Sequence, residues 1–156
     1  MSTETEKRRA SLERRIRRFY DLLNRGDFGR CHRIIDPRVR LKPSSVTLFQ
    51  YENALRQFLE QFGRVQVVGI DVGLHLNEPS ELYEGRDFAV GKTTWADRAG
   101  EQHVFSERWV REGRAWYTRS TGLLAPAAPT MRIPKVKTAE SPALPRGEDS
   151  RDAIPG

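Results

Sequence analysis

The fold is decided by the stretch FYDLLNRGDF, residues 19–28, which ends one predicted helix and begins another. Upstream of it, apolar side chains recur every three or four residues, a pattern that predicts an amphipathic helix from about residue 11. Gly26 suits the left-handed turn that ends a helix, and Asp27 can cap the next one. The apolar stripe consists of Leu12, Ile16, Phe19 and Leu23.

The elements that follow change from helical to strand periodicity. Residues 28–36 predict a short helix that stops at Pro37, and the alternation over 39–42 predicts a short strand. Thr47 and Gln50 have the spacing of a capping box, which predicts a further helix over 47–62. From residue 65 the apolar period is two, with Val68, Ile70 and Val72 expected on one face. Tight turns are expected at 97–100 and 112–114. The pattern predicts an α+β domain over 11–124, with N-terminal helices packed on a strongly curved antiparallel sheet.

The two ends of the chain differ from this middle. We expect residues 1–10 to be a flexible basic extension of the first helix. Residues 125–156 are rich in proline and charge, so we expect a disordered tail that cannot bury enough apolar surface to order itself. Within this tail, residues 131–137 offer two alternatives, a short docking motif or an added strand.

Charge and cysteine content narrow the function classes. The chain carries a net charge of +6, and residues 1–18 hold seven Lys or Arg against three Glu, so the domain body is nearly neutral. This distribution argues against nucleic-acid binding, which favours a basic face across the folded body. Cys31 is the only cysteine, and the three histidines have no zinc spacing, so we expect no disulfide, metal or cofactor. No apolar run reaches the ~18 residues of a membrane span, so we expect a cytoplasmic protein without membrane contact.

Three segments, taken in order, resemble the nuclear transport factor 2-like superfamily, including its SnoaL-like and ketosteroid-isomerase-like branches. The first is residues 19–28, which is similar to that family's junction between its first two helices. The second is IDPRVRL, residues 35–41, and the third is ERWVREGRAW, residues 107–116, which is similar to its final hairpin. The resemblance covers residues 11–124 and implies a cone-shaped α+β barrel around an internal pocket. It does not imply one activity, because the superfamily holds isomerases, cyclases, dehydratases, hydrolases and adaptor domains.

The ketosteroid-isomerase chemistry implied by the resemblance is disfavoured here. It needs a carboxylate base and two hydrogen-bond donors that face a developing oxyanion. Matching this chain to the family's motif places Phe19 and Phe105 at the donor positions and Lys42 at the base position. A phenyl ring donates no O–H hydrogen bond, and Lys42 is a cation. If the match is shifted by one residue, Tyr20 takes the first donor position in place of Phe19.

Residues 102–111 supply the remaining candidates for chemistry. Strand alternation places His103, Phe105, Glu107 and Trp109 on one face, which the resemblance turns toward the interior. His103 and Glu107 are then about 13 Å apart, at about 3.3 Å per residue, which is too far for a direct pair. Lys42 could pair with Glu107 if it points inward. The alternative is that Lys42 extends to solvent and Glu107 pairs with an arginine.

Three hypotheses for function follow. The first is a small-ligand-binding or adaptor domain with an apolar pocket. The second is a dehydratase, isomerase or cyclase that uses Glu107, His103 or Lys42 as acid or base. The third is an interaction module that acts through the basic N-terminal helix and the tail. In each case we expect a homodimer, because a sheet with helices on one side leaves its other face uncovered. The predicted pocket is lined by Phe19, Tyr20, Leu23, Lys42, Phe58, Phe105, Glu107 and Trp109.

Overall fold

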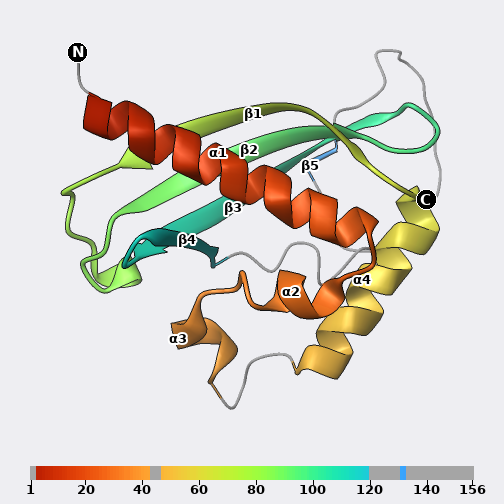
Figure 1. Cartoon of the computed structure of the whole chain (residues 1–156), viewed down its shortest axis with the longest axis horizontal. Coiled ribbons are helices and arrows are strands. Elements are labelled where there is room, and N and C mark those ends of the chain that lie inside the picture. Colours follow the sequence, from red (N-terminus) through yellow and green to blue (C-terminus); the bar gives the residue numbers. More distant parts are fainter. Residues whose placement is uncertain (1–2, 43–46, 120–130, 133–156) are drawn as a thin grey trace, which may run out of the picture.

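The computed structural model describes residues 3–42, 47–119 and 131–132, and it confirms the α+β order (Figure 1). Within these residues, four α-helices precede a sheet, and a short 3-10 helix, η1, lies between its first two strands. The elements are α1 (Thr3–Asn24), α2 (Phe28–His32), α3 (Pro37–Arg40), α4 (Leu48–Phe62), β1 (Gln66–His75), η1 (Glu81–Tyr83), β2 (Phe88–Ala96), β3 (Gln102–Glu112), β4 (Ala115–Thr118) and β5 (Met131–Arg132).

The sheet is antiparallel and has the strand order β1-β2-β3-β4. The two-residue strand β5 pairs with β3 at His103 and Val104, so the added strand anticipated within 131–137 exists at Met131–Arg132. The remainder of the predicted tail lies outside the described residues. Within the described part of the chain the sheet is open, because β1 pairs only with β2 and does not close onto β4. Helix α1 runs across one face of this sheet (Figure 1).

A β-bulge in β1 changes which side chains face the core. Val67 pairs with Trp95, but the next register partner is Gly69 with Thr94, so one extra residue is inserted between them. Val68 is 52% exposed, and the prediction that it shares the inner face with Ile70 is wrong. The bulge supplies the physical reason, because one inserted residue reverses the side-chain alternation along a strand.

The predicted helix ends are confirmed at two helices. Gly26 has φ +75°, the left-handed turn expected after α1. At α4 the Thr47 hydroxyl accepts a hydrogen bond from the Gln50 N–H, and the Gln50 side chain accepts one from the Thr47 N–H. Gly63 ends α4 with φ +73°, and a Cβ there would lie 2.7 Å from Cδ of Arg98.

The strand predicted over 39–42 is instead the short helix α3. The Asp36 carboxylate accepts a hydrogen bond from the Arg38 N–H, and Pro37 occupies the first helical turn, where its fixed φ fits. The contact with the sheet lies earlier in the chain, where Ile35 forms an isolated parallel bridge with Thr118. Lys42 consequently lies exposed in the turn after α3.

Asp36 also organises a set of ion pairs, called here the Asp36 cluster. Its fully buried carboxylate accepts two hydrogen bonds from Arg86, at 3.2 and 2.9 Å, and lies 3.3 Å from Nη1 of Arg119. Arg86 also pairs with Glu84 and, at 3.1 Å, with Glu112. Burial alone would raise the pKa of Asp36, but the hydrogen bonds from Arg86 and from the Arg38 backbone hold it below its usual value.

Three arginines of α1 bind the helix to the sheet region. Arg8 forms an ion pair with Asp87 at 2.9 Å, Arg9 donates to the Val72 carbonyl, and Arg15 donates to the Trp116 carbonyl at 2.9 Å. Residues 3–10, which include Arg8 and Arg9, therefore belong to α1 and contact the fold. Three of the seven basic side chains of α1 are therefore used in packing, and the other four, Lys7, Arg14, Arg17 and Arg18, are exposed.

Candidate functional site

The inner faces of β2 and β3 carry the polar groups that could perform chemistry. His103, Phe105, Glu107 and Trp109 are all buried, which confirms the predicted alternation along β3. Gly91 lies directly across from Glu107, and a Cβ on Gly91 would lie 3.3 Å from Nε1 of Trp109. A larger residue at that position would therefore meet the Trp109 indole.

Glu107 is the buried carboxyl of this face. It is 4% exposed, and its Oε1 has no hydrogen-bond partner. Within the described residues, neither a lysine nor an arginine forms an ion pair with it, so neither of the two predicted cation partners is found. Burial raises the pKa of Glu107 to about 7. The side chain can therefore either hold or release a proton near neutral pH.

Hydroxyl groups from two other elements lie near this carboxyl. Tyr20 on α1 lies close enough for the Glu107 charge to affect its pKa, and Thr93 lies on β2, the strand paired with β3. Both side chains are buried, and neither hydroxyl completes a hydrogen bond of good geometry, although the two are close enough for Thr93 to lower the pKa of Tyr20. Burial raises the pKa of Tyr20 well above its ordinary value, the Glu107 charge adds to this effect, and the Thr93 hydroxyl opposes it. Burial also raises the pKa of Tyr51 on α4, with contributions from the charges of Cys31 and Glu107. Glu107, Tyr20, Thr93 and Tyr51 are called here the interior polar cluster.

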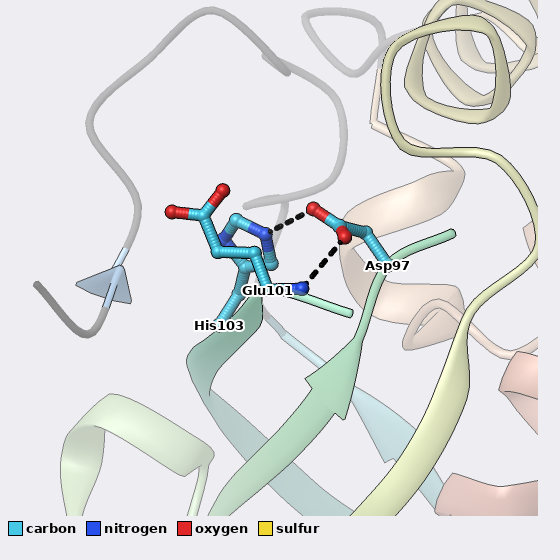
Figure 2. A group of neighbouring side chains, drawn as sticks. All are labelled: Asp97, Glu101 and His103. Carbon is cyan, nitrogen blue, oxygen red and sulfur yellow. Dashed lines mark hydrogen bonds and ion pairs between the residues drawn. The ribbon is translucent and has the colours of Figure 1, made fainter. Parts of the chain in front are cut away.

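The hydrogen-bond partner of His103 is Asp97, which the sequence did not suggest. Nε2 of His103 lies 2.9 Å from Oδ2 of Asp97, at the turn between β2 and β3 (Figure 2). The other Asp97 oxygen accepts the backbone N–H groups of Ala99 and Glu101 at 2.9 and 3.0 Å. Burial alone would raise the pKa of Asp97, but these hydrogen bonds hold it below its usual value.

Asp97, Glu101 and His103 also have the donors of a metal site, because one ligand atom of each lies within 4.8 Å of the others. Both Asp97 oxygens are already engaged by hydrogen bonds from the hairpin, however. The His103 ring stacks on Trp95 with centroids 4.5 Å apart, and it contacts Phe62 edge-on. These contacts give the three residues a structural role, which is to hold the β2–β3 turn against the end of α4.

Most of the predicted pocket residues are brought together. Seven of the eight are buried in one hydrophobic core or directly beside it: Phe19, Tyr20, Leu23, Phe58, Phe105, Glu107 and Trp109. The eighth, Lys42, lies exposed after α3 and is not part of this group. The structure adds Thr93 and Tyr51, which the sequence reading did not select. Thr93 could have been found from strand parity, because it lies two residues before the buried Trp95 and so shares its face of the strand.

A separate surface pocket lies where α2, α3 and the start of α4 meet. Its volume is about 460 Å³, and its lining residues are His32, Arg33, Arg40, Leu41, Thr47 and Leu48. None of them belongs to the predicted pocket. His32 is half-buried, and its ring lies 5.3 Å from that of Tyr51. The pocket therefore adjoins one member of the interior polar cluster.

None of the helices in the described part of the chain combines the length and the apolar composition that a membrane crossing requires. Comparison of the chain with protein-family models gave no match, and comparisons with curated proteins and with solved structures gave none either. The resemblance to the nuclear transport factor 2-like superfamily thus rests on the three sequence segments and on the order of the elements, and it stays a prediction.

Proposed function

We propose that this is a small-ligand-binding domain whose interior polar cluster holds a largely apolar ligand by one or two hydrogen-bonding atoms. The observation that carries the proposal is the set of buried polar atoms without partners: Oε1 of Glu107 and the hydroxyls of Tyr20 and Thr93. Leaving a buried donor or acceptor unpaired costs about 1–3 kcal/mol, so folded proteins rarely keep several in one place. A ligand carbonyl or hydroxyl would satisfy them.

The chemistry of the cluster sets the ligand class. Around neutral pH a protonated Glu107 donates a hydrogen bond, and the Tyr20 hydroxyl is a second donor, so the pair suits a ketone or ester oxygen. The side chains packed around the cluster are aromatic and aliphatic, which favours a cyclic apolar molecule. In this reading the helices and the sheet enclose the ligand as in the cone-shaped fold of the nuclear transport factor 2-like superfamily.

The test is a thermal-shift screen with a panel of cyclic ketones, including steroid-like ones, on the wild type and on Glu107→Gln and Tyr20→Phe. A ligand that binds the folded state raises Tm in proportion to its occupancy. We expect a shift in the wild type that both variants reduce and that the exposed control Glu60→Gln retains. An absent shift across the panel, or equal shifts in all four proteins, would argue against an interior site.

An enzyme of the isomerase, dehydratase or cyclase type is the second candidate, favoured by the pKa of about 7 at Glu107. A general acid or base works best when its pKa lies near the operating pH. Any ketone that binds should then exchange the hydrogens next to its carbonyl for deuterium faster in the presence of the protein. The exchange rate should change with an inflection near pH 7 and be lost in Glu107→Gln. Binding without exchange would assign the domain to binding alone.

We also propose that the sheet face opposite α1 forms a homodimer. The bulge turns Val68 outward at 52% exposure, and Val90 and Val104 lie on the same outer face at half-buried positions. Sedimentation equilibrium should give a dimer mass for the wild type and a shift toward monomer for Val68→Lys. A monomer mass for the wild type at high concentration contradicts this assembly.

A further inference from the structure

The pocket between α2, α3 and the start of α4 has the size of a ligand site. Its volume is about 460 Å³, and small-molecule sites are commonly about 300–1,000 Å³. Three helices contribute to its wall: His32 and Arg33 come from the end of α2, Arg40 and Leu41 from the end of α3, and Thr47 and Leu48 from the start of α4.

The charge of this pocket is unbalanced. Arg33 and Arg40 both line it, and among the described residues no Asp or Glu does. In the described part of the chain neither guanidinium forms an ion pair, whereas nearby Arg38, Arg86 and Arg119 each bind carboxylates. A guanidinium presents several N–H donors in a fixed plane and binds carboxylates by paired hydrogen bonds. Two such groups at one pocket favour an anionic ligand.

The apolar part of the wall indicates what the anion is attached to. Leu41 is 76% exposed and Leu48 is 44% exposed, and both line the pocket. Phe49, the next residue of α4, is also largely exposed. Exposed apolar side chains grouped around a pocket mark a binding surface more often than single ones do. An inorganic anion would leave these leucines in water, while an anion with a short apolar chain would cover them.

We infer that this pocket binds a small amphipathic carboxylate, with its carboxylate on Arg33 and Arg40 and its apolar chain against Leu41 and Leu48. The inference is independent of the proposed interior site, because the two share no residue and Glu107 is not needed for it.

The experiment is a calorimetric titration of the full chain with octanoate, compared with octanol and with acetate as probes. We expect saturable octanoate binding that weakens as salt is added, and much weaker binding of octanol and acetate, because each lacks one of the two recognised parts. The double variant Arg33→Gln/Arg40→Gln should lose about tenfold or more in octanoate affinity. Glu107→Gln should bind octanoate as the wild type does, which separates this site from the interior one.

The matched control is Arg14→Gln/Arg17→Gln, which removes the same charge from two exposed positions on α1. It should keep wild-type octanoate affinity, and thermal unfolding should show that both double variants remain folded. NMR shift changes on octanoate addition should concentrate at His32, Arg33 and Arg40. The inference is overturned if octanoate does not saturate the wild type, if octanol binds equally well, or if both double variants lose affinity alike.

Discussion

Replacing Glu107 by glutamine isolates the energetic effect of a buried carboxyl. Glutamine has nearly the same shape and can hydrogen-bond, but it does not ionise. Burial raises the pKa of Glu107 from 4.5 to about 7 in the folded domain. Below pH 4.5 the carboxyl is protonated in both folded and unfolded chains, so its ionisation does not affect stability there.

The sign of the pH effect follows from which state holds the proton. Between pH 4.5 and about 7 the unfolded chain releases the proton while the folded domain retains it, so the free energy of unfolding falls as pH rises. Above about pH 7 both states are ionised and the loss is complete. At about 1.4 kcal/mol per tenfold change in proton affinity, the full loss is on the order of 3 kcal/mol.

The assay is urea unfolding followed by tryptophan fluorescence at a series of pH values. Asp36 and Asp97, whose pKa values are lowered, add a pH dependence of opposite sign in acid, but it is common to both proteins and cancels in their difference. We expect Glu107→Gln to become more stable relative to the wild type as pH rises from 4.5 to 7. Parallel stability curves, or an NMR titration that places the Glu107 pKa near its ordinary value, would refute the reasoning.

Three further substitutions test the packing that surrounds the site. Asp36→Ala should lower the free energy of unfolding by about 3–5 kcal/mol, because it removes the buried carboxylate and leaves Arg86 and Arg119 only the more exposed Glu84 and Glu112. Glu112→Ala at the exposed edge of the cluster should change it by under about 1 kcal/mol. Gly91→Ala should destabilise by about 1–3 kcal/mol, because the new Cβ would lie 3.1 Å from Cδ1 of Ile16, whereas Gly73→Ala meets no atom closer than 4.0 Å and should be near neutral. Thr47→Ala removes the α4 cap and should cost about 1 kcal/mol. Urea unfolding at pH 7 measures all three, and reversed orders within the two matched pairs would contradict these assignments.

Local signals were enough to predict several elements. The Thr47–Gln50 box and Gly63 fix both ends of α4 within a few residues of sequence, so no distant contact is needed to place that helix. The alternation of β3 similarly predicted that Glu107 shares a face with His103, Phe105 and Trp109, although only the family resemblance turned that face toward the interior. Both signals depend on properties of neighbouring residues, which the sequence displays directly.

Other features of the fold and the site depend on contacts between residues far apart in the sequence. Residues 39–42 alternate like a strand, although Asp36 and Pro37 just before them form a local helix-start signal. The contact of Asp36 with Arg86, fifty positions along the chain, then holds that cap in place. The bulge after Val67 lies beside Gly69, but Gly73 on the same strand has no bulge, so glycine alone does not locate it. Tyr20 and Tyr51 come to the interior polar cluster from two helices, α1 and α4, so their place near Glu107 could not be read from spacing along the strands.

The Asp36 cluster has a consequence for the order in which the chain folds. Its members lie before α3, around η1, at the β3–β4 turn and after β4, and the Asp36–Arg86 contact spans fifty positions. Contacts between such distant segments require long loops to close first, so they form late. Interactions that form after the folding barrier act mainly by slowing unfolding. These ion pairs should therefore prolong the lifetime of the native state while leaving the folding rate nearly unchanged.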